Sequence, residues 1–104
     1  MNPGELREVA TAMTSETIRE KGITTYNYVP ISKFRCKVKL DKTKTFYNND
    51  KRKIYRSLIF LCHRRSYFVI DNFIKYKDNM YRITDVIPFE NGQYLQVYVE
   101  SVES

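Results

Sequence analysis

The clearest pattern along the chain is a strict alternation of apolar and basic residues from Phe34 to Leu40. Successive side chains of a β-strand point to opposite faces, so this alternation predicts a strand. Phe34, Cys36, Val38 and Leu40 would then face a core, while three cations would face water.

Four further segments also resemble strands. The run from Ser57 to His63 is apolar on both faces, which is typical of a strand that is covered on both sides. The other three segments are rich in β-branched or aromatic residues and are bounded by polar turns. They run roughly from Phe68 to Tyr76, from Met80 to Ile87 and from Gln93 to Val99.

Two short polar segments predict the hairpins that join these strands. Residues 77–79, Lys-Asp-Asn, suit a tight turn because Asp and Asn tolerate left-handed backbone. Asn91-Gly92 is a stronger hairpin signal. In the last strand, the aliphatic residues 95, 97 and 99 are expected to face inward, and Tyr94 and Tyr98 are expected at a rim or against a partner.

The amino-terminal region fits two kinds of element. Leu6, Val9, Ala10 and Met13 lie at helical spacing, but Val9, Thr11 and Met13 also alternate as a strand would. Periodicity leaves both alternatives open.

Residues 41–55 are polar and basic and show no sustained period. We interpret them as a long loop between two strands, longer than most connections in compact domains. Loops of this length are more often functional or disordered than incidental.

The pattern as a whole predicts a mainly β protein, a small antiparallel β-barrel or sandwich with a long basic loop between strands. A chain of 104 residues forms a single domain at this size. We expect it to consist of an N-terminal segment, 1–32, and a β-core, 33–100, that includes loop 41–55.

Charge singles out the middle of the chain. The formal net charge is +6, and ten basic residues but only two acidic ones lie between Lys33 and Arg56. Cations interleaved with aromatic rings suit contact with nucleic acid, because cations bind phosphates and rings stack on bases. The candidate contact residues of the loop are Lys42, Lys44, Phe46, Tyr47, Lys51, Arg52 and Lys53.

Other readings of the charged residues remain open. The loop could be an ordinary surface loop. The cations of the first strand, Arg35, Lys37 and Lys39, are expected to form a solvated face. Arg64 and Arg65 are candidates for a second basic turn, or for residues that keep a sheet edge soluble.

Catalysis and metal binding find little support in the sequence. Cys62 and His63 are adjacent, so along a strand they point to opposite faces and cannot pair as nucleophile and base. Cys36, Cys62 and His63 cannot supply four metal ligands at a finger-like spacing, and we expect both cysteines to be core residues. We therefore expect no enzyme, no catalytic residue, no metal and no cofactor.

Membrane contact is also not expected. No apolar run approaches the roughly 20 residues of a bilayer span. The first residues lack the basic and apolar blocks of a signal peptide, so we expect a soluble chain that is not exported.

Several segments, in this order, resemble the head-tail joining (head closure) family of tailed bacteriophages. The chain opens with Met-Asn-Pro-Gly-Glu-Leu-Arg, close to the Asn-Pro-Gly-x-Leu-Arg start of that family. The resemblance continues through the strand at 34–40 and the apolar strand that ends in Cys62-His63-Arg64. Residues 74–86, Ile-Lys-Tyr-Lys-Asp-Asn-Met-Tyr-Arg-Ile-Thr-Asp-Val, resemble the family's terminal hairpin, with Asp78-Asn79 in place of its turn glycine.

The resemblance implies a structural virion protein of a tailed phage or prophage. Such a protein forms a ring at the head-tail interface, closes the DNA exit channel after packaging and provides the surface on which the tail docks. The implied partners are a portal or adaptor ring, a tail or tail-terminator protein, packaged double-stranded DNA and further copies of the chain. The implied location is the virion, and the bacterial host cytoplasm during assembly; whether the isolated chain is a monomer stays open.

A mechanism follows if the basic loop is repeated around such a ring. Repetition would concentrate positive charge at the channel, where Lys42, Lys44, Lys51, Arg52 and Lys53 would contact DNA or the adaptor. Phe46 and Tyr47 would pack loop against loop. The alternative is a free-standing, basic nucleic-acid-binding β-barrel that binds DNA tightly as a monomer.

Overall fold

The computed structural model describes residues 3–48 and 51–102, apart from the side chains of Pro3, Phe46, Asn48, Lys51 and Lys53. One short 3-10 turn precedes the strands, and no helix in these residues is long and apolar enough to cross a bilayer. The elements are η1 (Pro3–Glu5), β1 (Glu8–Glu20), β2 (Ile23–Asn48), β3 (Lys51–His63), β4 (Phe73–Tyr76), β5 (Asn79–Phe89) and β6 (Tyr94–Ser101).

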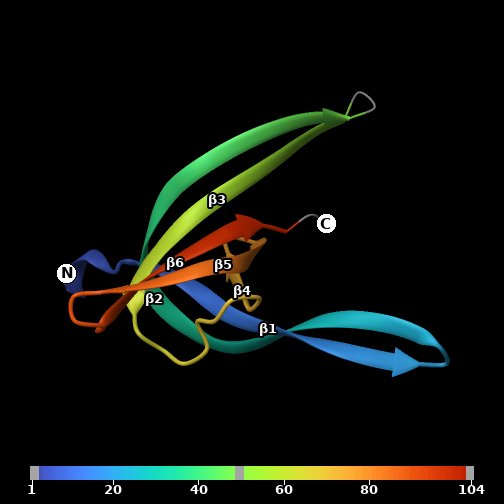
Figure 1. The fold of residues 1–104 in the computed structure, drawn as a ribbon, viewed down its shortest axis with the longest axis horizontal. Coiled ribbons are helices and arrows are strands. Elements are labelled where there is room, and N and C mark those ends of the chain that lie inside the picture. The colour runs from blue at the N-terminus through green and yellow to red at the C-terminus, as the bar shows by residue number, and fades with distance from the viewer. Residues whose placement is uncertain (1–2, 49–50, 103–104) are drawn as a thin grey trace.

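The strands of the described residues close a barrel in the order β1-β2-β3-β6-β5-β4 (Figure 1). Every neighbouring pair is antiparallel, and β4 closes the ring by pairing with β1. β2 serves two partners in turn, because its first part pairs with β1, its last part pairs with β3, and Cys36 pairs with both. The prediction of a mainly β fold is confirmed, and the architecture is the barrel.

The amino-terminal ambiguity is settled in favour of a strand. Ala10 and Ala12 point inward from β1 and are buried. Val9, which precedes Ala10 on the strand, points outward and is exposed. Small inward residues suit this position because Phe34, directly opposite Ala10, and Ile74, opposite Ala12, fill the adjoining space. A helix would have turned Val9 toward the core.

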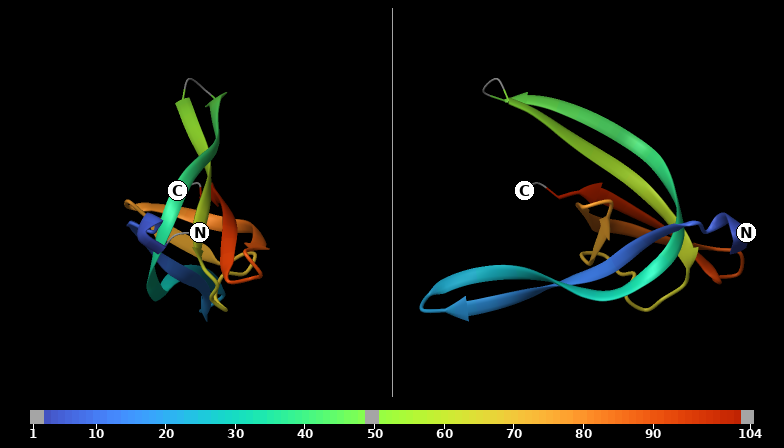
Figure 2. Two further views of the ribbon diagram at one scale, coloured as in Figure 1. Left: turned by 90° about the vertical axis from the view of Figure 1, so that its left-hand side faces the viewer. Right: turned by 180° about the vertical axis from the view of Figure 1, so that it is seen from behind.

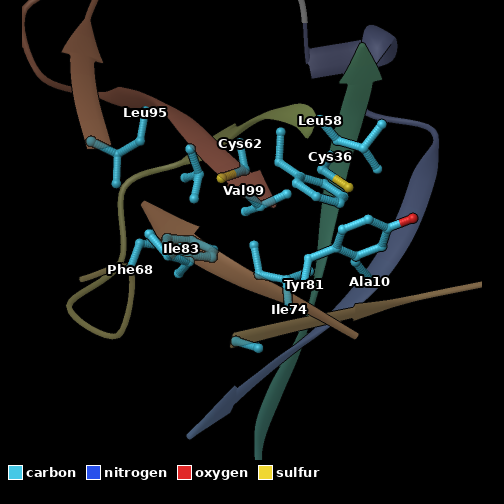
Figure 3. Packing of buried hydrophobic residues seen from close by; sticks show 13 residues of the cluster. Ala10, Cys36, Leu58, Cys62, Phe68, Ile74, Tyr81, Ile83, Leu95 and Val99 are labelled. Carbon is cyan, nitrogen blue, oxygen red and sulfur yellow. The ribbon is translucent and has the colours of Figure 1, made fainter. Parts of the chain in front are cut away.

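The core fills the barrel with side chains from every strand (Figure 3). Its buried members are Ala10, Ala12, Cys36, Leu58, Phe60, Cys62, Phe68, Ile74, Tyr81, Ile83, Leu95, Val97 and Val99. Phe60 is fully buried and meets the rings of Phe34, Tyr76 and Tyr81 edge-on, with centroid distances of 5.5–6.4 Å. Edge-to-face contacts of this kind add stability beyond the area that they bury.

Two long two-stranded hairpins project from the barrel on the side where β6 ends, and they diverge from each other (Figures 1 and 2). In the first, Thr14 to Glu20 of β1 pair with Ile23 to Val29 of β2; we call residues 14–29 the N-terminal arm. In the second, residues 42–48 of β2 pair with residues 51–57 of β3; we call residues 42–57 the basic arm.

The basic arm overturns the interpretation of residues 41–55 as a loop. β2 continues through Asn48 and β3 already begins at Lys51. The backbone groups of this segment bond to one another across the ribbon, so the segment is regular although neither of its faces covers the core. A hydrophobic alternation was absent from the sequence because no face of the ribbon needs one.

Each arm leaves the barrel at a β-bulge in β2. The register shifts between Ala12 and Met13 leave Ile31 as the extra residue, and the shift between Leu40 and Lys42 leaves Asp41 as the extra residue. A bulge bends a strand and increases its twist. The two bulges therefore mark where the ribbons turn away from the closed barrel.

The predicted hairpin turns are confirmed. Lys77 and Asp78 both have positive φ, 48° and 63°, in a two-residue loop between β4 and β5. Asn91 and Gly92 have φ of 59° and 80° between β5 and β6. A third tight turn, Lys21-Gly22, closes the N-terminal arm.

Three details of the predicted strands are wrong. The segment from Phe68 is a turn until β4 begins at Phe73, held by the Asn72 side chain, whose Nδ2 donates to the Tyr67 carbonyl oxygen at 2.9 Å. Leu40 is 64% exposed beside the bulge at Asp41, although Leu58 directly opposite it is buried. Tyr94 is buried rather than at a rim, since its ring packs on those of His63 and Phe89.

Candidate functional site

The candidate contact residues lie on a projecting ribbon rather than on a loop. Lys42 and Lys44 are exposed on the β2 strand of the basic arm, opposite Ser57 and Tyr55 of β3. An antiparallel ribbon fixes the direction of each side chain, so these lysines are held on one face of the arm.

This face continues the outer surface of the barrel. Cys36 points inward, so Arg35, Lys37 and Lys39 point outward, as the alternation predicted. Without the bulge, Lys42 and Lys44 would point to the opposite face. The extra residue, Asp41, shifts the phase by one position. Lys42 and Lys44 therefore lie opposite Ser57 and Tyr55, on the same outer face as Lys39 opposite Ile59.

The result is one row of cations along β2, from the barrel onto the arm. We call it the cationic row. Its members are Arg35, Lys37, Lys39, Lys42 and Lys44. Alternate residues of a strand are roughly 6.6 Å apart, so the row extends about 30 Å along the ribbon. A row of cations at strand spacing suits a polyanion whose charges also repeat.

The other face of the basic arm has a different character. Arg52, Ile54 and Arg56 alternate along β3 on the face that leads into the core at Leu58, and Tyr47 lies directly opposite Arg52. All four arm residues are exposed, Tyr47 at 77%. The predicted contributions of the Phe46, Lys51 and Lys53 side chains fall outside the described side chains.

A cleft lies on each side of the root of the basic arm. One, of about 310 Å³, is lined by Asp41, Lys42, Lys44 and Glu100 among others, and it mixes both signs of charge. The second, of about 710 Å³, extends from Ile54 on the basic arm to Tyr28 on the N-terminal arm. Both clefts are open, so they present surfaces rather than enclosed small-molecule pockets.

Arg64 and Arg65 do not join this site. They follow the far end of β3, separated from Arg52 by roughly 40 Å of strand at about 3.3 Å per residue. The Arg64 amide donates to the Gln93 carbonyl oxygen at 3.0 Å, and the Arg65 guanidinium donates to the Arg64 carbonyl oxygen at 2.8 Å. Both arginines are exposed and cap the opposite end of the barrel.

The two cysteines face each other across β2 and β3 inside the core (Figure 3). Burial raises the pKa of the Cys36 thiol to about 12, with a smaller contribution from Glu8. Burial also raises the pKa of Cys62 to about 12, and Cys36 adds to this. Neither thiol is an accessible thiolate nucleophile. His63 is exposed on the outside, and within residues 3–48 and 51–102 no three His, Cys, Asp or Glu side chains are grouped to hold a metal.

The alignment of the barrel cations with those of the basic arm was not foreseen from the sequence. Arg35, Lys37 and Lys39 were expected to form a solvated face, and the structure places them in line with Lys42 and Lys44. The signal that joins the two groups is the bulge at Asp41. A change of phase in the basic alternation, from odd to even positions, marks that bulge in the sequence.

Comparison with known proteins gives a match in structure and none in sequence. No protein-family model and no curated protein sequence matches the chain. Among solved structures, the fold is similar to a chain in a structure described as the virion of a native gene transfer agent (GTA) particle. The TM-score is 0.74 at 9% sequence identity, and the match covers 95% of this chain and 97% of that one. At this identity the likeness shows a shared fold.

Proposed function

We propose that this chain is a structural virion protein of a tailed phage, a prophage or a related particle. The observation that carries the proposal is the likeness to a chain of a GTA virion, which spans nearly the full length of both proteins. Because the match covers 95% of this chain, it extends beyond the barrel strands onto the arms, which a free-standing barrel does not need for its own core.

The more specific role that we propose is closure of the head. A ring of copies at the head-tail interface closes the DNA exit channel after packaging and offers the tail its docking surface. The motifs at residues 1–7 and 74–86 support this role through their resemblance to the head-tail joining family. The partners are then a portal or adaptor ring on one side and a tail or tail-terminator protein on the other.

The cationic row supplies the contact with DNA in this proposal. Each copy presents the row from Arg35 to Lys44 along one strand, with Lys51 and Lys53 as further candidates. Symmetry repeats the row around the channel, so a modest charge per subunit becomes a strong collective field. Arg52 belongs to the other face of the arm and is not needed for this contact.

The test is a reconstitution with DNA-filled, tailless heads that lack their closure protein. Purified protein is added, and the DNA retained and the tails joined are counted. The proposal expects both to be restored. No gain in either count would contradict the closure role.

A matched pair of variants then isolates the cationic row. Lys39→Gln/Lys42→Gln/Lys44→Gln removes three exposed cations from the row, and Lys75→Gln/Lys77→Gln/Arg82→Gln removes three exposed cations from β4, β5 and their turn. The first variant is expected to lose retention of DNA while the control keeps it. Equal retention by both variants would rule out a specific role for the row.

The second candidate function is a free-standing nucleic-acid-binding barrel. It is favoured by one feature, since the cationic row is already complete on a single copy. That function predicts tight binding of free DNA by the monomer, with affinity falling steeply with salt, by about 0.9 in log-log slope per phosphate contacted. The closure role predicts weak binding by the isolated chain.

A further inference from the structure

Both arms are two-stranded ribbons without a core of their own. β1 pairs with β4 only from Thr11 to Met13, and β3 pairs with β6 only from Ser57 to His63. Beyond these residues, the two strands of each arm pair only with each other. An isolated two-stranded hairpin is marginally stable in water, so long arms of this kind gain from a surface that covers one face.

One face of the N-terminal arm combines acidic and apolar residues. Glu16, Ile18 and Glu20 alternate along β1, and Ile23 lies directly opposite Glu20 across the ribbon. All four side chains are exposed, Ile23 at 68%. The face is therefore a stripe of two carboxylates and two isoleucines near the tip of the arm.

One face of the basic arm combines basic and apolar residues in the same way. Arg52, Ile54 and Arg56 alternate along β3, and Tyr47 lies opposite Arg52. This stripe carries two guanidinium groups, one isoleucine and one tyrosine. Arginine and tyrosine are enriched where proteins meet, because both combine apolar area with directed hydrogen bonds.

We propose that these two stripes are the two halves of one contact between copies of this chain. The Glu16/Ile18/Glu20/Ile23 face of one copy packs on the Tyr47/Arg52/Ile54/Arg56 face of a second copy. Each stripe alternates charged and apolar groups at strand spacing, the signs of charge are opposite, and the two ribbons are each about 20 Å long at roughly 3.3 Å per residue. The inference deepens the proposed function, because it specifies the surface through which copies join.

The geometry favours a contact between copies over one within a copy. The two arms of one molecule leave the barrel at separate bulges and diverge toward their tips (Figures 1 and 2). The tip of one arm therefore lies away from the tip of the other. A contact that joins two different surfaces is head-to-tail, and repeated head-to-tail contacts close into rings or extend into filaments.

Charge reversal tests the pairing directly. Glu16→Arg/Glu20→Arg puts arginines on both stripes, and Arg52→Glu/Arg56→Glu puts carboxylates on both. Either variant alone is expected to self-associate at least about tenfold more weakly than the wild-type chain in sedimentation at low salt. Lys75→Glu/Arg82→Glu is the matched control on β4 and β5, and it is expected to associate like the wild-type chain.

Mixing the two reversed variants gives the decisive result. Each arm of one variant then meets an arm of opposite charge on the other, so the equimolar mixture is expected to associate again in alternating order. A mixture that associates no better than its components would overturn the proposal. So would a wild-type chain that remains monomeric at the highest soluble concentration, on the order of 1 mM.

A crosslink provides a measurement that does not depend on charge. Chains that carry Ile18→Cys are mixed with chains that carry Ile54→Cys and oxidised gently, while the native thiols stay buried. Disulfide-linked pairs are expected in clear excess over a mixture of Ile18→Cys with Val69→Cys, which places the second thiol on the exposed segment between β3 and β4, outside the basic arm. Equal yields would contradict the contact.

These measurements need neither heads nor DNA. If the arms pair in solution but the protein fails to close heads, the contact between copies is supported and the proposed function is refuted. If the protein closes heads but shows neither charge rescue nor crosslinking, the proposed function is supported and the contact between the two stripes is refuted.

Discussion

The barrel and the arms are built from the same strands, yet they differ in what their side chains meet. In the barrel, every strand contributes side chains to one core, and members such as Phe60, Ile74 and Val97 are fully buried. In the arms, both faces are open to solvent, and residues such as Tyr26 and Tyr47 are more than two thirds exposed. Burial therefore stabilises the barrel, whereas the arms depend mainly on backbone pairing beyond their roots, where Tyr28 still packs on Phe73 of β4.

β2 shows how one strand can serve both regions. Its middle lies in the barrel, its first part forms half of the N-terminal arm, and its last part forms half of the basic arm. The bulges at Ile31 and Asp41 separate the three parts. A strand that is interrupted in this way can keep a packed core while it presents surfaces well outside the barrel.

The largest effect of any single change is expected in the barrel core. Phe60→Ala removes a fully buried ring that meets Phe34, Tyr76 and Tyr81. The lost burial and the cavity left behind should lower the free energy of unfolding by about 3–5 kcal/mol. Urea unfolding followed by circular dichroism measures this, and a loss below about 1 kcal/mol would mean that the barrel is not the stabilising unit.

This contrast also explains how much of the fold the sequence predicts. The barrel strands were predictable because a face that covers a core must alternate, as Leu95, Val97 and Val99 do in β6. The turns at Lys77-Asp78 and Asn91-Gly92 were predictable because left-handed backbone restricts the residue types. The arms were not predictable in the same way, since neither of their faces covers a core.

The candidate site was predictable in composition but not in arrangement. The sequence identified Lys42, Lys44 and Arg52 as one cluster, whereas the structure divides them between two faces of a ribbon. The bulge at Asp41 decides this division, and a one-residue shift of phase is difficult to distinguish from an irregular loop. The local signal of the N-terminal arm in the sequence is Gly22. A glycine favours the positive φ that both Lys21 and Gly22 adopt in this two-residue hairpin turn.

The next effect concerns alkaline pH and again separates barrel from arms. The pKa values of Cys36 and Cys62 are raised by burial from about 9 to about 12, so the unfolded chain loses these protons first. The contribution of the two thiols to stability is therefore nearly constant below about pH 9 and falls above it, by about 1 kcal/mol for each thiol by pH 10. Burial raises the pKa of Tyr81 as well, which acts in the same direction.

Unfolding in urea at pH 8 and at pH 10 measures this loss. A Cys36→Ala/Cys62→Ala variant is the control, because it should be less stable at pH 8 but lose less between the two values. At pH 8, a thiol reagent should not modify either cysteine until the barrel unfolds. Fast modification of the native protein would contradict the buried environment of the thiols.

A smaller and local effect is expected at the tip of the N-terminal arm. Gly22 has φ of 78°, and a methyl group added there would meet nothing within 4 Å. Gly22→Ala therefore costs only backbone strain, about 1 kcal/mol, confined to the hairpin. Hydrogen exchange should become faster in residues 14–29 and stay unchanged in β5 and β6; equal changes in both would show that arm and barrel unfold together.

The smallest effect on the isolated chain, and the sharpest test of the comparison, is expected from Ile23→Ser. Ile23 is 68% exposed on the N-terminal arm, so the substitution removes little buried area and should change the free energy of unfolding by less than about 0.5 kcal/mol. The same side chain lies in the acidic and apolar stripe that we place against a second copy, so self-association should weaken several-fold while unfolding is unaffected. Sedimentation and urea unfolding on the same samples separate the two quantities. If stability and association fell together, the arm would be part of the folding unit; if neither changed, the apolar half of the stripe would have no role in the contact.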